Sequence, residues 1–298
     1  MSTWARIKRH KVSYLFIAPF GILFFTFTVI PVLVAMVLSF TNFNMLQAPS
    51  FVGWSNYIRL FLEDEVFLIA IKNTFIFASI TGPLSYLACF LVAWLINELK
   101  PWLRAILTLL FYAPAISGKA YYIWTIIFSG DTYGILNANL LYWGIIDRPI
   151  QWLNDPAFIM PITILVVLWM SLGTSFLVFI AGLQGIDHRL YEAGAIDGIR
   201  HRWQELWHLT IPMMRGYLMF GAIMAITNSF TIFNEIRDLT GFPSTDYAAH
   251  TIIQALQDHG SIRFEMGYAS AIAVVLFLTM LTIQRVVQKL LNRVGGGQ

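Results

Sequence analysis

Long apolar stretches constrain this chain more than any other feature of its sequence. A helix that crosses a membrane needs about 20 mostly apolar residues. Charged residues make up only 12% of the chain, whereas a soluble domain carries roughly 25%. We therefore predict an all-α integral membrane protein with six transmembrane helices, at about residues 13–40, 69–97, 104–128, 157–183, 213–234 and 267–290.

The first of these segments follows a short basic N-terminus. A signal peptide has an apolar region of about 7–15 residues that ends at a small-residue cleavage site. The run from Val12 to Phe40 is about twice that long and has no such site. We expect it to be retained as the first span. We also expect Pro114 to interrupt the third span, and Pro212 to begin the fifth, because proline suits the first helical turn.

Lysine and arginine are unevenly distributed between the two sides of the predicted membrane. Positive residues concentrate on the cytoplasmic side of membrane proteins. The segments on the N-terminal side hold Arg6, Lys8, Arg9, Lys11, Lys100, Arg104, Arg189, Arg200, Arg202, Arg215, Arg285, Lys289 and Arg293. The opposite side holds Arg59, Arg148, Arg237 and Arg263. We predict cytoplasmic N- and C-termini (1–12 and 291–298) and a core of the remaining five transmembrane helices at 69–290.

The predicted outer loops are long and rich in acidic residues. They include the cluster Glu63, Asp64 and Glu65, and further carboxylates before the fourth and sixth spans. Two interpretations remain open. The loops are either ordinary solvated connections or a platform that receives an external protein.

One inner connection, residues 185–212, is too long to be a simple turn. Asp187 is a good N-cap for a short helix, and Gly198 suits the left-handed conformation that ends one. A second short helix would then place Trp203, Leu206 and Trp207 on one side. Such helices either lie on lipid or insert into a groove of a cytoplasmic protein. The small residues at 193–195 favour a protein partner, because they permit close backbone approach.

The residues of this loop resemble a known motif. The run Tyr191–Gly198, followed by Leu209–Pro212, resembles the EAA loop of binding-protein-dependent ABC importer permeases, in the maltose and glycerol-3-phosphate branch. The resemblance covers nearly the whole chain, including Phe51–Tyr57, Pro114–Ser117 and Gly267–Ala271. Three residues depart from the family's pattern, namely Gly194, Ile199 and Phe242.

The resemblance implies a type I ABC importer permease fold and a bacterial plasma membrane location. It also implies a second related permease, two copies of a cytoplasmic ATPase and an extracytoplasmic solute-binding protein. This chain would bind no cofactor and would not be an enzyme, because ATP and Mg²⁺ would belong to the ATPase. The ATPase-coupling residues would be Tyr191, Glu192, Ala193, Gly194, Asp197, Gly198, Trp203 and Pro212.

The resemblance also places a substrate path along the fourth and fifth spans. Neutral hydrogen-bonding groups suit a polyol, and an asparagine amide both donates and accepts. The alternative is that small and polar residues join the helices to one another. The predicted path residues share a helical face in each span: Met170, Ser171 and Thr174 in the fourth, and Ala225, Asn228, Ser229 and Ile232 in the fifth.

Two further residues have simple interpretations. Lys119 is an ionisable residue in the predicted third span, and we expect its side chain to reach the outer headgroups, with contact to substrate or binding protein as the alternative. Cys89, the single cysteine, precludes an intrachain disulfide and is expected to behave as a small apolar residue.

The motifs that the sequence lacks exclude several functions. It has no phosphate-binding Gly-x-x-x-x-Gly-Lys-Ser/Thr loop, and His201, Glu205 and His208 lack the spacing of a zinc protease. Nothing in the sequence indicates nucleic-acid binding. The main hypothesis is an ABC importer permease for a sugar or oligosaccharide. The alternatives are an importer of another solute, such as a glycerol phosphodiester or polyamine, and an ion-coupled secondary transporter, although such transporters usually contain paired halves that this sequence lacks.

Overall fold

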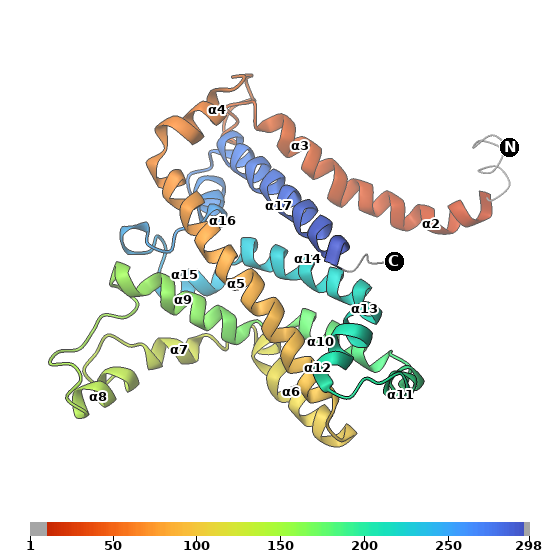
Figure 1. Ribbon diagram of the computed structural model, residues 1–298. Coiled ribbons are helices and arrows are strands. Elements are labelled where there is room, and N and C mark those ends of the chain that lie inside the picture. The colour runs from red at the N-terminus through yellow and green to blue at the C-terminus, as the bar shows by residue number, and fades with distance from the viewer. Residues whose placement is uncertain (1–10, 295–298) are drawn as a thin grey trace. The chain divides into compact units, whose positions relative to one another are not determined.

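The structure, a computed structural model, describes residues 11–294 and is helical (Figure 1). The β-structure in this range is a single isolated antiparallel bridge between Thr41 and Phe51. The prediction of an all-α protein is therefore confirmed. The basic residues Arg6, Lys8 and Arg9 and the tail at 295–298 lie outside the described residues.

Five helices of the described range are long and apolar enough to cross a membrane. They correspond to five of the six predicted spans, with ends that shift by a few residues. They are Val12–Leu38, Glu65–Asn97, Pro156–Gln184, Arg215–Thr240 and Met266–Asn292.

The third predicted span differs from the expectation. The apolar helix α6 runs from Pro101 to Ser117, which is about 26 Å at 1.5 Å per residue. Pro114 lies inside this helix, so the predicted interruption there is wrong. The chain instead leaves the helix at Gly118, whose φ of 63° is left-handed. Glycine adopts this conformation readily and commonly ends helices. The short helix α7 (Tyr122–Ile127) follows.

The chain forms two compact units, of which the first comprises Met1–Glu65 with Ala255–Phe277. Its described elements are α2 (Lys11–Phe24), a π-helical turn (Phe25–Val29), α3 (Ile30–Leu38), α4 (Ser55–Ile58), two further π-helical turns (Arg59–Glu63 and Asp258–Ile262) and the beginning of α17 (Met266–Val294). The helical stretch from α2 to α3 contains no buried residue in the span Val12–Leu38. A membrane or a partner must therefore solvate its apolar side chains.

A polar network joins the predicted outer segments within the first unit. Arg59 pairs with Glu265 at 3.2 Å, and the ring of His259 hydrogen-bonds Glu265 at 2.9 Å. The Tyr268 hydroxyl donates to Asp64 at 2.7 Å. Burial alone would raise the pKa of the Glu265 carboxyl, but His259 and Arg59 outweigh it and lower that pKa. Part of the acidic charge predicted for the outer loops is thus paired within the chain.

The second unit comprises Val66–Gln254 with Leu278–Gln298. Its helices include α5 (Glu65–Asn97) and α6, which are followed by α7, α8 (Ile135–Tyr142), α9 (Pro156–Met170), α10 (Thr174–Gln184), α11 (His188–Ile196), α12 (Arg202–Glu205), a π-helical turn (Leu206–Thr210), α13 (Ile211–Met213), α14 (Arg215–Thr231), α15 (Asn234–Thr240), a 3-10 turn (Thr245–Tyr247) and α16 (Ile252–Gln257).

Helices α10 and α14 pack closely because each sets a glycine against an aromatic ring of the other. An ideal Cβ added at Gly182 of α10 would lie 2.7 Å from Cγ of Tyr217, and one at Gly221 of α14 would lie 2.5 Å from Cε1 of Phe179. Small residues permit this close approach between membrane helices. Phe179 is fully buried in an apolar cluster that also includes Cys89 and Phe90 of α5. These two helices carry both ends of the 185–212 loop and part of the cavity described below.

Candidate functional site

The 185–212 loop folds as a short helix, a glycine turn and a second helical segment (Figure 1). The side chain of Asp187 accepts a hydrogen bond from the Arg189 N–H at 3.0 Å, so the predicted N-cap of α11 is confirmed. Gly198 has a φ of 96°, as predicted for the turn. The Ile199 N–H donates to the Gly194 carbonyl at 2.9 Å, and this bond closes the end of α11.

The second helical segment is less regular than predicted. Helix α12 spans only Arg202–Glu205, and the chain then widens into a π-helical turn from Leu206. This change breaks the regular i, i+3, i+4 spacing. Leu206 is buried, whereas Trp203 and Trp207 are exposed, so the three side chains do not form one exposed face.

The inner side of the loop packs against itself. Gly194 is buried, and an ideal Cβ there would lie 2.7 Å from Cδ1 of Leu209 and 3.1 Å from Cδ1 of Ile199. The Tyr191 hydroxyl and the buried Thr210 hydroxyl are 3.2 Å apart and hydrogen-bonded. Burial raises the pKa of Tyr191, and the bond to Thr210 opposes that rise. The two halves of the loop therefore form one packed element.

Two contacts fasten this element to the end of α5. Arg202 pairs with Glu98 at 2.6 Å, and the rings of Trp203 and Trp94 lie 5.5 Å apart. The ion pair is partly exposed and worth less than about 1 kcal/mol. The aromatic contact contributes about 0.5–1.5 kcal/mol beyond its buried area. The position of the loop thus depends more on the tryptophan pair than on the ion pair.

The outer side of the loop is open. Ile196 is 87% exposed, an unusual state for a large apolar side chain. Of the eight predicted coupling residues, Gly194 is buried and Tyr191 is half-buried. The other six are exposed: Glu192, Ala193, Asp197, Gly198, Trp203 and Pro212. The loop therefore presents the carboxylates of Glu192 and Asp197 and the side chain of Ile196, with the small residues Ala193 and Gly198 beside them.

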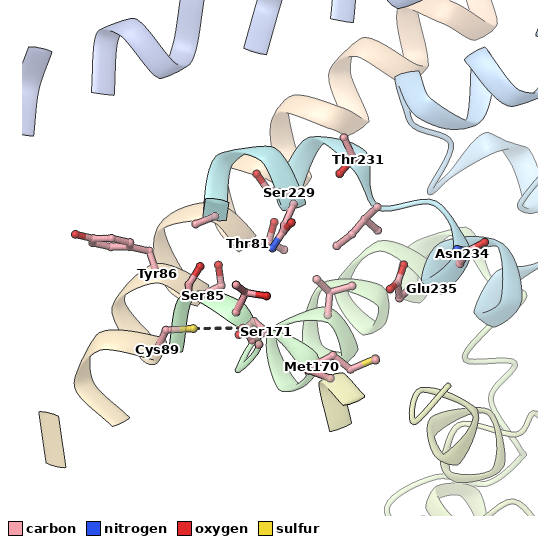
Figure 2. Close-up of a pocket in the computed structure, with 18 of the residues that line it drawn as sticks. Thr81, Ser85, Tyr86, Cys89, Met170, Ser171, Ser229, Thr231, Asn234 and Glu235 are labelled. Atoms are coloured by element: carbon pink, nitrogen blue, oxygen red, sulfur yellow. Dashed lines mark hydrogen bonds between the residues drawn. The ribbon is translucent and has the colours of Figure 1, made fainter. Parts of the chain in front are cut away.

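A cavity of about 430 Å³ lies in the second unit (Figure 2). Its wall is built by residues of α5, α6, α9, α10, α14 and α15. All seven predicted path residues line it: Met170, Ser171, Thr174, Ala225, Asn228, Ser229 and Ile232.

The path residues line this cavity from helices that are broken, whereas the prediction placed them on continuous helical faces. The fourth span breaks between α9 and α10, at Ser171–Gly173, so Met170 and Thr174 belong to different helices. Figure 2 shows the Cys89 thiol directed at Ser171, and it donates to the Ser171 carbonyl at 3.2 Å. That bond satisfies a carbonyl at the break. Cys89 is buried, as expected of a small apolar residue, but it also supplies this hydrogen bond.

Helix α14 of the fifth span ends one residue earlier than the predicted face requires. Helix α14 stops at Thr231, and Ile232 has an extended backbone with ψ of 118°. Ile232 is therefore beyond the helix that carries Ala225 and Asn228, although all three line the cavity. Residues 232–233 separate α14 from α15, whose first residues also face the cavity.

Known proteins resemble this chain along most of its length. It is 33% identical over 278 residues to the "Probable ABC transporter permease protein YesP" of Bacillus subtilis (strain 168), across 91% of this chain and 87% of that one. The chain belongs to the ABC transporter permease family. The permease is also 32% identical over 231 residues to "Lactose transport system permease protein LacF" of Rhizobium radiobacter, across 76% of each chain. A comparison with protein-family profiles found no match.

The fold of the permease matches a solved structure of the same class. That structure is a bacterial alginate ABC transporter in complex with an alginate pentasaccharide-bound periplasmic protein. The match covers 98% of each chain with a TM-score of 0.77 and 23% sequence identity. The predicted ABC importer permease fold is therefore confirmed, and the permease is a multi-pass membrane protein.

The cavity of the permease includes polar residues that sequence reasoning missed. Thr81 and Ser85, four positions apart on α5, could have been recognised as one polar face of the second span. Asn234 is the last residue of the predicted fifth span and Glu235 begins the predicted outer loop, so neither was assigned to the path. The missed polar residues are Thr81, Ser85, Tyr86, Tyr112, Ser175, Thr231, Asn234 and Glu235.

Other predicted features of the permease lie apart from the cavity. The ammonium group of Lys119 lies 5.8 Å from the ring centroid of Tyr122, beyond the Gly118 break. Its reach to the outer headgroups stays a prediction. Phe242, a departure from the family's pattern, packs its ring 5.9 Å from that of Phe233, which lines the cavity. Within residues 11–294, no group of three or more His, Cys, Asp or Glu side chains could hold a metal ion.

Proposed function

We propose that this chain is a permease subunit of an ABC importer that translocates a sugar or oligosaccharide. An extracytoplasmic binding protein would deliver the substrate, and a separate cytoplasmic ATPase would drive transport through the 185–212 loop. The permease itself would carry out no catalytic chemistry. Its polar cavity, lined mainly by hydroxyl and amide groups, is the observation that carries this proposal.

The chemistry of the cavity suits a sugar. Its polar lining residues are mainly hydroxyl and amide groups, and these donate and accept hydrogen bonds as sugar hydroxyls require. Tyr86, Tyr112 and Phe233 add aromatic surface to the wall. A volume of about 430 Å³ falls within the roughly 300–1,000 Å³ of small-molecule sites. The names of relatives point the same way, because LacF is a lactose permease and the matched structure is an alginate importer.

The loop suits a protein partner. The exposed carboxylate of Glu192 would pair with a basic group of the ATPase, and the exposed Ile196 would enter an apolar part of its cleft. The loop would then lie in the cytoplasm together with both termini. A second related permease would complete the membrane pore, and two ATPase copies would engage the two coupling loops.

Transport by the reconstituted complex tests the proposal. The permease, its co-purifying subunits and the binding protein are placed in proteoliposomes, and uptake of radiolabelled saccharides is measured with internal or external ATP as the orientation requires. We expect uptake to stop with an ATPase-inactive partner and to persist when ion gradients are dissipated. Uptake that follows an ion gradient instead would support a secondary transporter. Uptake of a glycerol phosphodiester or polyamine, with no saccharide transported, would refute the sugar assignment.

The coupling role is tested by Glu192→Lys and Gly198→Asp. Both variants should insert into the membrane but lose transport and substrate-stimulated ATPase activity. The reasons are that the first reverses an exposed charge and the second strains a left-handed backbone position. Asp147→Lys makes the same charge reversal at an exposed carboxylate outside the loop and should leave coupling intact. Normal coupling in both loop variants would refute the docking role.

The path role is tested by Asn228→Leu. Leucine has the same number of side-chain heavy atoms and the same branching but cannot hydrogen-bond a sugar, so uptake should fall or change its sugar preference while the complex still assembles. Unchanged transport kinetics would remove Asn228 from the path.

A further inference from the structure

The wall of the cavity carries one carboxylate and no basic group among its lining residues. Glu235, in the first turn of α15, contributes that carboxylate (Figure 2). The other polar lining side chains are uncharged serine, threonine, asparagine, tyrosine and cysteine residues. The fixed charge that this chain gives to the cavity is therefore negative.

The basic group nearest to Glu235 in sequence is committed elsewhere. The guanidinium of Arg237 is hydrogen-bonded to Asp238 at 2.7 Å and lies over the ring of Phe233 at 5.3 Å. Asp238 in turn accepts hydrogen bonds from Tyr121 at 2.7 Å and from Tyr122 at 3.4 Å. Arg237 and Asp238 thus neutralise each other. Within residues 11–294, Glu235 has no ion pair within 4.0 Å, so its charge is left to act on the contents of the cavity.

A fixed carboxylate distinguishes saccharides by their charge. In a cleft with apolar surroundings, a charge of one sign concentrates ions of the opposite sign and excludes ions of its own sign. Sugar hydroxyls and ammonium groups can donate hydrogen bonds to a carboxylate, and such bonds are stronger than neutral ones. A uronate cannot donate from its own carboxylate and is repelled.

We propose that Glu235 sets the charge selectivity of this cavity, admitting neutral or amino saccharides and rejecting those that carry uronic acids. This inference rests on the proposed function, since it names the class of sugar that the cavity accepts. It separates this permease from its fold relative, whose structure is described as an importer of the acidic polysaccharide alginate.

The charge of the cavity is measured first. Thr231, an exposed lining residue, is replaced by cysteine in the assembled complex, and its labelling by a cationic and an anionic methanethiosulfonate is followed by the mass of this chain. The buried Cys89 of the unsubstituted chain gives the background rate. The ratio of the cationic to the anionic labelling rate should be on the order of tenfold higher at this cysteine than at a simple thiol in solution. Glu235→Gln should abolish that preference, whereas the matched control Asp246→Asn, which removes an exposed carboxylate outside the cavity, should retain it.

Selectivity is then measured with an uncharged thiol reagent that labels the same cysteine. The measured quantity is how much each saccharide slows this labelling. Neutral and amino disaccharides should slow labelling, and a uronate disaccharide should not. In the Glu235→Gln background the uronate should protect as well as the neutral sugar. Equal protection by uronate with Glu235 present, or a reagent preference unaffected by Glu235→Gln, would overturn the proposal. Neither readout depends on ATP or on the binding protein, so these results are separable from the uptake test.

Discussion

The reciprocal packing of α10 and α14 yields a prediction whose size can be worked from the structure. Gly221 lies on α14 directly against the ring of Phe179 on α10. An ideal Cβ at Gly221 would lie 2.5 Å from Cε1 of that ring and closer still to Cζ. Carbon atoms in contact prefer about 3.5–4.0 Å, so Gly221→Ala requires a displacement of at least about 1 Å.

The surroundings leave the ring little room to move. Phe179 is fully buried, and its ring makes edge contacts with the rings of Tyr86 at 5.6 Å and Phe90 at 5.7 Å. Overpacking of a well-filled core typically costs about 1–3 kcal/mol. Alanine in place of glycine stabilises a helix by up to about 1 kcal/mol. The net loss of stability should therefore be about 0–2 kcal/mol. We expect the upper half of this range because the rings of Tyr86 and Phe90 confine the ring of Phe179.

The measurement is the thermal unfolding midpoint of the purified complex in detergent. A loss of about 1–2 kcal/mol should lower the midpoint by a few degrees. Gly216→Ala is the matched control on the same helix, since an added Cβ there meets nothing within 4 Å. That variant should be neutral or slightly more stable. Phe179→Leu in the Gly221→Ala background should restore part of the lost stability, because the smaller side chain relieves the overlap.

Two results would refute this reasoning. One is an equal response of the midpoint to Gly221→Ala and Gly216→Ala, which would mean that the overlap is relieved at no cost. The other is strict additivity of Gly221→Ala and Phe179→Leu, because residues in direct contact should show a coupling of at least about 0.5 kcal/mol.

Three further perturbations test other parts of the chain. Gly267→Ala should lower the thermal midpoint more than Gly221→Ala, because its Cβ would overlap the backbone carbonyl of Thr41, which cannot rotate away. The pKa of Glu265 is lowered from 4.5, so its contribution to stability is present above that pH and lost on acidification. The difference in midpoint between the unsubstituted chain and Glu265→Gln should accordingly shrink as the pH falls below about 4.5. Gly194→Ala and Ile199→Ala should each destabilise the complex, and the double variant should be more stable than their sum predicts, whereas additivity would contradict their contact.

The positions of the spans could be predicted from the sequence because apolar length is a local property. Five predicted spans match helices of the structure to within a few residues. The predicted third span differs from the structure in the residue at which its helix is interrupted. The sequence predicts an interruption at Pro114, whereas in the structure α6 continues past Pro114 and ends at Gly118. A proline remains helical when its surroundings satisfy the freed backbone group, and the sequence does not reveal those surroundings.

The residues that line the cavity could be predicted from the sequence only in part. The seven path residues were assigned to helical faces, and all seven line one cavity, yet two of the underlying faces are broken. At the break, the Cys89 thiol of α5 donates a hydrogen bond to the Ser171 carbonyl. This is a long-range contact between positions 89 and 171, which the sequence does not show. Glu235 was assigned to an outer loop because the sequence does not show that the chain re-enters the cavity wall after α14 ends.

The two departures from the motif within the 185–212 loop show how residues can compensate in space. Compared with the motif one position at a time, Gly194 lacks a methyl group and Ile199 is larger than the usual alanine. In the structure they are neighbours across the Gly198 turn. The Ile199 N–H bonds the Gly194 carbonyl, and its Cδ1 lies 3.1 Å from the place where an alanine Cβ would stand. Ile199, together with Leu209, thus fills the volume that Gly194 leaves. Both departures are on the packed side of the loop, so the exposed side, with Glu192 and Ile196, is free to retain the surface that a partner would recognise.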